Sequence, residues 1–125
     1  MNTSIHWFEI ATVDITRAIR FYETVLGTKL LQEESGPRTL AIFPTREPKG
    51  TTGCLVNTAE RNQPSTQGTL VYLGCGGQLD ACLARVQQAG GAVVQPKTDI
   101  GPNGVFAIVR DTEGNHVGLH DEAIG

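Results

Sequence analysis

The sequence predicts an α+β fold made of two βαβββ units, in which a curved mixed sheet surrounds a cleft. Each half of the chain has one amphipathic helix pattern and several short strand-like runs. The two halves also share a fixed offset. Gly27 and Gly91, which are expected to end the two helices, lie 64 residues apart, and so do the helix-face residues Ala18 and Cys82. A common offset of this kind indicates an internal duplication.

A single domain accommodates this pattern, because 125 residues are enough to bury one hydrophobic core. We expect the first unit over residues 4–58 and the second over residues 68–121. Residues 59–67 are polar, contain Pro64 and read as a linker. A single ferredoxin-like unit is the structural alternative, but eight strands and two helices exceed what it needs.

The first unit begins with a strand over residues 4–11, whose alternation places Trp7 and Glu9 on one face. Asp14 is expected to cap the following helix, because its carboxylate can accept hydrogen bonds from free backbone N–H groups. Gly27 is expected to end that helix in the left-handed conformation. Three further strands are predicted at residues 29–34, 38–43 and 53–57.

The second unit repeats this order. A strand is predicted over residues 69–75, and an apolar stripe that includes Cys82 predicts a helix stopped by Gly90 and Gly91. Three more strands are predicted at residues 92–96, 105–110 and 116–121. Between the last two, residues 111–115 read as a turn in which Gly114 and Asn115 can adopt positive φ.

Composition excludes several classes of partner. The net charge is −3 with both signs scattered, so the chain lacks the basic clusters that nucleic-acid binding needs. No apolar run approaches the length of a membrane span, and the first residues do not resemble a secretion signal. We therefore expect a cytoplasmic protein with a small-molecule ligand.

The three cysteines, Cys54, Cys75 and Cys82, are odd in number and have no CxxC spacing. They predict neither a disulfide framework nor a zinc knuckle. All three are read as small buried residues of strands or of a helix face. Cys75 keeps an alternative as a reactive thiol, because it precedes a helix by a few residues.

Three segments in order resemble the vicinal-oxygen-chelate superfamily, the family of glyoxalases, bleomycin-resistance proteins and dioxygenases. The first covers residues 8–10 and 14–27, the second residues 71–73 and 79–91, and the third residues 111–120. The likeness extends over nearly the whole chain and is nearest to the glyoxalase-related branch. It implies two units around a cleft and a homodimer. In metal-dependent members it also implies a divalent metal, held by His and Glu side chains, that stabilises an enolate-like intermediate.

Carried over by position, most of these metal ligands are missing. The four ligand positions fall on Trp7, on Thr69 or Val71, near Leu55 and on Gly118. None of these side chains offers a hard divalent cation a strong ligand. The chain could therefore bind a divalent metal or no cofactor at all, and the missing ligands favour the absence of a cofactor.

Glu9 and His120 are candidate catalytic residues and candidate metal ligands of a site shifted along the strands from the usual one. Glu9 shares a strand face with the ligand position at Trp7, and His120 shares one with the ligand position at Gly118. If both point into the cleft, they could hold a metal or transfer a proton. The alternative is that Glu9 accepts hydrogen bonds within the sheet while His120 lies at a solvated strand end. Candidate ligand-binding residues are Trp7, Asn57, Thr69, Val71 and Gly118.

Two functions remain open at this stage. The first is a glyoxalase-related enzyme of lyase, isomerase or dioxygenase type that acts on a small oxygenated metabolite, with Glu9 and His120 in the chemistry. The second is a metal-independent protein that binds a small molecule or antibiotic, as bleomycin-resistance proteins do. That protein would need no ligand set, and Trp7 could stack on a planar compound.

Overall fold

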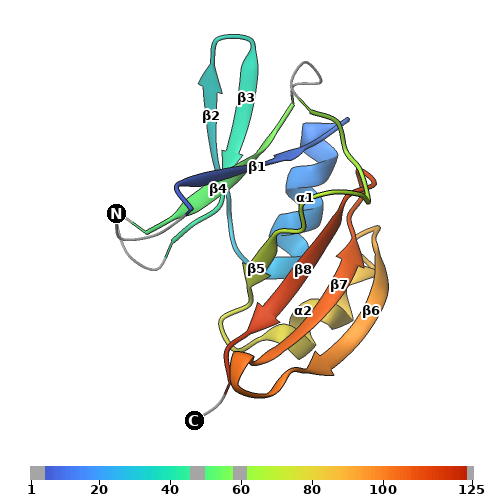
Figure 1. Ribbon diagram of the computed structural model, residues 1–125. Helices are drawn as coiled ribbons and strands as arrows, with labels where there is room; N and C mark the ends of the chain where they lie inside the picture. The colour runs from blue at the N-terminus through green and yellow to red at the C-terminus, as the bar shows by residue number, and fades with distance from the viewer. Residues whose placement is uncertain (1–4, 46–49, 58–61, 124–125) are drawn as a thin grey trace.

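Two four-stranded mixed sheets with the same strand order form the fold of the computed structural model, which describes residues 5–45, 50–57 and 62–123 (Figure 1). One sheet has the order β1-β4-β3-β2 and the other β5-β8-β7-β6. In each sheet the first and last strands of the unit are parallel neighbours and the remaining pairs are antiparallel. The elements are β1 (Trp7–Ala11), α1 (Ile15–Leu26), β2 (Leu31–Ser35), β3 (Arg38–Ile42), β4 (Thr52–Val56), β5 (Tyr72–Gly74), α2 (Leu79–Val86), β6 (Ala92–Asp99), the 3₁₀ turn Gly101–Asn103, β7 (Val105–Arg110) and β8 (His116–Asp121).

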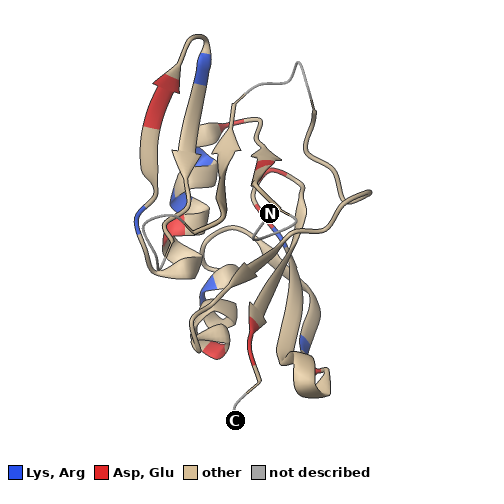
Figure 2. Ribbon diagram, turned by 60° about the vertical axis from the view of Figure 1, so that its left-hand side comes forward, with Lys and Arg blue, Asp and Glu red and all other residues tan. Residues whose placement is uncertain are grey.

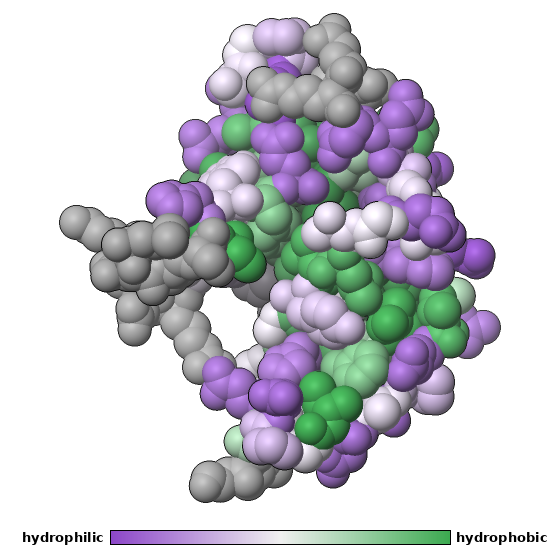
Figure 3. Space-filling view, in the orientation of Figure 1, coloured by the Kyte–Doolittle hydropathy of each residue, from purple (hydrophilic) through white to green (hydrophobic). Residues whose placement is uncertain are grey.

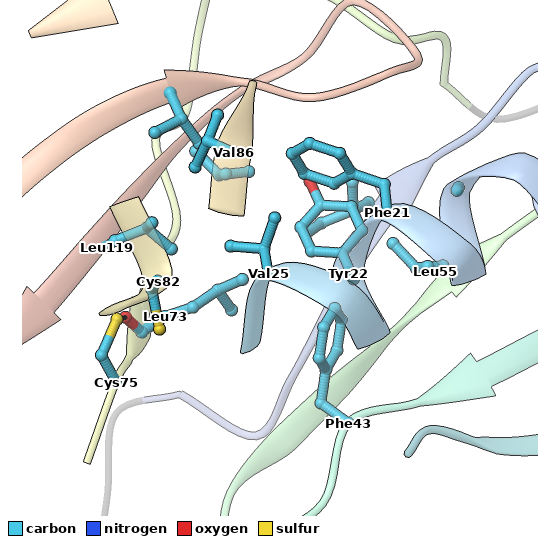
Figure 4. Close-up of a cluster of buried hydrophobic side chains, with 14 of the residues drawn as sticks. Phe21, Tyr22, Val25, Phe43, Leu55, Leu73, Cys75, Cys82, Val86 and Leu119 are labelled. Atoms are coloured by element: carbon cyan, nitrogen blue, oxygen red, sulfur yellow. Dashed lines mark hydrogen bonds between the residues drawn. The ribbon is translucent and has the colours of Figure 1, made fainter. Parts of the chain in front are cut away.

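The predicted α+β fold of two βαβββ units is confirmed, but the two sheets do not close on each other. β1 and β5 are edge strands, and within the described part of the chain no strand ladder joins one sheet to the other. Instead, the helices connect the halves. α1 packs against α2, and one apolar cluster includes residues from both sheets and both helices (Figure 4). The core is therefore shared between the units.

Helix α1 follows its predicted signals closely. The Asp14 side chain accepts a hydrogen bond from the N–H of Arg17 at 3.1 Å, and Gly27 ends the helix at φ 69°. Helix α2 ends earlier than predicted, at Val86, and a turn of several residues separates it from Gly90. Strand β5 is also shorter than predicted, so Thr69 and Val71 precede the strand instead of lying within it.

A reciprocal contact relates the ends of the two helices. Arg85 on α2 reaches Gly27, where its Nη2 would lie 3.2 Å from an added Cβ. The same nitrogen donates to the carbonyl of Val25 in the last turn of α1 at 2.8 Å. Conversely, Phe21 on α1 reaches Gly91, where its ring would lie 2.6 Å from an added Cβ. Both glycines therefore leave room for a side chain of the opposite helix.

A buried carboxylate fastens α1 to the turn between β7 and β8. Glu113, whose side chain is 0% exposed, accepts from the N–H groups of Val13 and Asp14, both at 2.7 Å, and from Arg17 Nε at 2.8 Å. The hydroxyl of Thr112 donates to the same carboxylate at 2.9 Å. Burial alone would raise the pKa of Glu113, but these hydrogen bonds outweigh it and hold the pKa below its usual range.

A second carboxylate, Asp111, extends this connection into the core. It accepts from the hydroxyl of Tyr22 at 2.6 Å and from the backbone N–H groups of Glu113 and Asn115. Burial raises the pKa of Tyr22 well above its usual value, and the neighbouring Asp111 adds to the effect. Of the two turn residues that can adopt positive φ, Gly114 does so at 94° and Asn115 does not. Its amide instead donates to the carbonyl of Ala11 at 2.8 Å and so connects the turn to β1.

Candidate functional site

Two predicted site residues, Trp7 and Glu9, lie on the face of the first sheet that points away from α1. Phe8 and Ile10 alternate with them and pack into the core. Glu9 is in register with Cys54 on β4, which is in turn in register with Ile42 on β3. Because residues in register point to the same side of a sheet, Trp7, Glu9 and Cys54 share this open face.

An ion pair anchors Glu9 on that face. Nη2 of Arg38, on β3, donates to Glu9 Oε2 at 2.6 Å, and both side chains are about four-fifths buried, with 20% and 22% exposed. Burial and then the Glu9 charge raise the pKa of the Cys54 thiol to about 11, while Arg38 and a hydrogen bond with Trp7 act in the opposite direction. Trp7, Glu9, Arg38 and Cys54 therefore form one cluster, which we call the Glu9 cluster. The β2–β3 hairpin beside it carries acidic and basic residues on neighbouring strands (Figure 2).

A cleft of about 430 Å³ lies between β1 and the segment that leads into the second sheet. We call it the Glu9 cleft, because Glu9 forms part of its wall. Thr69 and Val71 lie on the opposite wall, so three of the predicted site residues meet here. His116 and Asn115, at the start of β8, also line it. The complete lining is Phe8, Glu9, Ile10, Ala11, Asn62, Gln63, Ser65, Gln67, Thr69, Val71, Asn115, His116 and Val117.

The other predicted site residues lie elsewhere. His120 lines a separate cleft of about 670 Å³ beside the start of α2, and its Nε2 lies 2.6 Å from the carbonyl of Asn103. Asn57 follows β4, where its Oδ1 accepts from the N–H of Thr39 at 2.9 Å. Gly118 is covered by the ring of Tyr72, which would lie 2.3 Å from an added Cβ. Neither Asn57 nor Gly118 lines the Glu9 cleft.

These contacts do not fit the divalent metal that metal-dependent relatives imply. The Glu9 carboxylate is held by a guanidinium, and Glu9 and His120 line different clefts. The last-strand ligand position is a glycine beneath an aromatic ring. Within residues 5–45, 50–57 and 62–123, no three His, Cys, Asp or Glu residues are grouped closely enough to hold a metal ion. We derive no reaction step through a metal.

Arg38 is the residue of the Glu9 cluster that the sequence did not reveal. It lies 29 residues after Glu9, and only the pairing of three strands brings the two together. One signal in the sequence could have indicated it: Arg38 is a charged residue on a strand whose same-face residues, Leu40 and Ile42, are apolar. A charged residue in such a strand requires a partner when the strand is buried.

The architecture and the order of the strands match a known family over nearly the whole chain. The family model described as glyoxalase/bleomycin resistance protein/dioxygenase superfamily matches residues 4–119. The chain belongs to this superfamily. No significant match is found among functionally curated proteins.

Solved structures of this superfamily share the fold. A glyoxalase/bleomycin resistance protein from Albidiferax ferrireducens matches with a TM-score of 0.73 and 16% identity, over 96% of this chain and 100% of that one. TnmS3, an antibiotic-binding protein from a Streptomyces species, matches with a TM-score of 0.69 and 27% identity, over 98% and 99%. A glyoxalase I mutant from Zea mays matches with a TM-score of 0.68 and 23% identity, over 93% of this chain and 45% of that one.

None of the helices in the described part of the chain is long and apolar enough to cross a membrane.

Proposed function

We propose that this superfamily member binds a small, partly aromatic molecule in the Glu9 cleft without a metal ion. The observation that carries the proposal is that Glu9, which lines the cleft, is fixed by an ion pair with Arg38 on the neighbouring sheet face. The guanidinium holds the carboxylate in place, and its oxygens can accept hydrogen bonds from a ligand. The 430 Å³ volume lies within the range of ligand pockets, about 300–1,000 Å³.

The chemistry of the lining favours a ligand with both a planar ring and polar groups. Trp7 does not line the cleft, but it is 44% exposed on the neighbouring face that carries Glu9, so its indole is open to stacking on a ligand that extends beyond the cleft. Thr69 and Gln67 supply polar groups from the opposite wall, and Val71 supplies apolar surface. The likeness to the antibiotic-binding TnmS3, at 27% identity over almost both full chains, supports a ligand of this class.

An enzymatic role on a small oxygenated metabolite is the second candidate. The Glu9 cleft also contains His116, so two groups that can exchange protons line the same space. In that case Glu9 would act with His116, in place of the predicted partner His120. Turnover of a ligand found in the binding assay below, followed by mass spectrometry, distinguishes an enzyme from a binder.

Fluorescence of Trp7, the only tryptophan, tests the binding proposal. A panel of planar, oxygenated antibiotics is titrated into the protein with and without a metal chelator. We expect a ligand that quenches Trp7 equally in both conditions. Glu9→Gln should weaken its affinity by about tenfold, equivalent to about 1.4 kcal/mol and to the loss of one charge-assisted hydrogen bond.

His120→Ala is the matched control, because His120 lines the other cleft. Its affinity for the ligand should equal that of the unchanged protein. Loss of binding in the presence of chelator would show a metal-dependent site. Equal weakening by His120→Ala and Glu9→Gln would place the ligand outside the Glu9 cleft. Either result rejects the proposal.

We also propose that two copies of the chain associate. Large apolar side chains are exposed on both sheets, including Leu31 at 62%, Tyr72 at 49% and Val94 at 49%. The face shown in Figure 3 has apolar surface between polar regions. A second copy would cover such surface, and this supports the homodimer that the family resemblance implies. Light scattering coupled to size exclusion tests it; a species with the mass of one chain at all concentrations contradicts it. A cytoplasmic location stays a prediction of the sequence.

A further inference from the structure

Two of the three cysteine thiols lie side by side, outside the Glu9 cleft. Cys75 follows β5, and Cys82 lies in the second turn of α2. Their sulfur atoms point toward each other in the shared core (Figure 4). Cys75 Sγ also lies 3.9 Å from the carbonyl oxygen of Leu73, and Arg85 Nη2 lies 3.8 Å from Cys82 Sγ.

Hydrogen bonds of the intervening turn fix the position of one cysteine relative to the other. The N–H of Gln78 donates to the carbonyl of Cys75 at 3.0 Å, and the N–H of Cys82 donates to the carbonyl of Gln78 at 2.9 Å. The carboxylate of Asp121 accepts from the N–H groups of Gly77 and Leu79, both at 2.9 Å. These bonds hold the two thiols beside each other, which is the arrangement that a disulfide requires.

A cavity between the two units gives a small reagent access to one of these thiols. Cys75 lines a cavity of about 470 Å³, together with Phe8, Phe43 and Tyr72. It is 9% exposed, whereas Cys82 is 1% exposed and Cys54, on the first sheet, is 0% exposed. Reactivity of the pair is therefore expected to begin at Cys75.

We propose that Cys75 and Cys82 are a site of oxidative modification and form a disulfide with each other when a hydroperoxide enters this cavity. The Cys75 sulfur attacks the terminal oxygen of the hydroperoxide and the O–O bond breaks. The leaving oxygen takes the thiol proton, and Cys75 becomes a sulfenic acid. The Cys82 sulfur then attacks the Cys75 sulfur, the S–O bond breaks, and hydroxide leaves with the Cys82 proton as water.

In the net reaction two thiols and one hydroperoxide give a disulfide, an alcohol or water from the hydroperoxide, and one water. The thiols lose two electrons and the O–O bond gains them. Burial, and then the neighbouring Cys82, raises the pKa of Cys75 to about 12. The thiolate is therefore scarce at neutral pH, and the reaction is slow.

The test uses the purified chain and hydrogen peroxide under native conditions. Samples are taken over several hours, unfolded in the presence of a thiol-alkylating reagent and analysed by intact mass and peptide mapping. We expect a species about 2 Da lighter before alkylation, with a bond between residues 75 and 82 and Cys54 fully alkylated. A thiol reductant should restore the starting mass.

Cys54→Ser is the matched control and should form the disulfide as the unchanged protein does, while Cys75→Ser should form none. Cys82→Ala serves as a second variant, and circular dichroism checks that each variant is folded. The proposal is overturned if no bond between residues 75 and 82 forms. It is also overturned if Cys54 joins disulfides at the same rate, because that indicates reaction through the unfolded chain.

Discussion

Replacing Glu113 by glutamine tests whether the buried carboxylate holds the two units together. The carboxylate accepts two backbone N–H groups on one oxygen, and Arg17 Nε and the Thr112 hydroxyl on the other. Glutamine has nearly the same shape but keeps only one acceptor oxygen. If that oxygen faces the N–H groups of Val13 and Asp14, the new NH₂ group faces the donor Arg17.

The cost can be worked from these contacts. The two backbone hydrogen bonds lose the carboxylate charge, which removes about 1 kcal/mol each, since charge-assisted hydrogen bonds contribute about 1.5–3 kcal/mol and neutral ones about 0.5–1.5. The lost Arg17 bond adds little, because Arg17 is 44% exposed and water replaces much of the interaction. We therefore expect Glu113→Gln to lower the free energy of unfolding by about 2 kcal/mol.

Urea unfolding at several pH values measures this effect. The folded-state pKa of Glu113 is lowered, so its contribution is present above the unfolded pKa, about 4.3, and is lost as the pH falls through the folded value. The difference between the two proteins should be constant near neutrality and should shrink in acid. Glu33→Gln, at an exposed position on β2, should change stability by less than about 0.5 kcal/mol. A neutral-pH difference as small as that control, or one that does not change in acid, would refute the reasoning.

Two further substitutions test the packing. Gly53→Ala should lower the free energy of unfolding by about 3 kcal/mol or more, because the added Cβ would lie 2.3 Å from the backbone oxygen of Phe8. Gly74→Ala is the control, because a Cβ added there meets nothing within 4 Å. Thermal unfolding of both variants measures the difference, and equal stabilities would contradict the β1–β4 pairing. Tyr22→Phe should cost about 1–2 kcal/mol, because the buried Asp111 loses the donor at 2.6 Å. In the unchanged protein, the pKa of Tyr22 is raised well above its usual value. The ultraviolet signal of Tyr22 should therefore not titrate until the protein unfolds in alkali. Titration of both tyrosines in the folded protein would show that Tyr22 is not buried.

Local signals predicted the fold well where the structure depends on neighbouring residues. The cap at Asp14 and the left-handed Gly27 both act within one helical turn, so the bounds of α1 could be derived from the sequence. Strand β5 was overestimated because its length depends on pairing with β8, which covers only Tyr72–Gly74. Alternation of residues shows which face a strand buries but does not show where a ladder ends.

The candidate site was harder to predict for the same reason. Residue alternation correctly placed Trp7 and Glu9 on one face, but a shared face in one strand does not reveal neighbours from other strands. Arg38 reaches Glu9 only through the register of β1, β4 and β3. The sequence allowed His120 to meet Glu9 if both pointed into a common cleft, but the two residues line different clefts. Sequence patterns contain no direct information about how two sheets are oriented.

The reciprocal contacts at Gly27 and Gly91 describe an approximate twofold axis between the helices. Position 21 of the first unit and position 85 of the second are equivalent under the 64-residue offset, and each extends over the glycine that follows the other unit's helix. In a dimer of identical half-chains one residue type would have to serve both contacts. Joining the halves in one polypeptide removes that constraint. One contact could become the ring of Phe21, packed in the core, and the other the guanidinium of Arg85, which binds the carbonyl end of a helix. The fused chain thus retains the geometry of a symmetric pair while its two halves are free to diverge in chemistry.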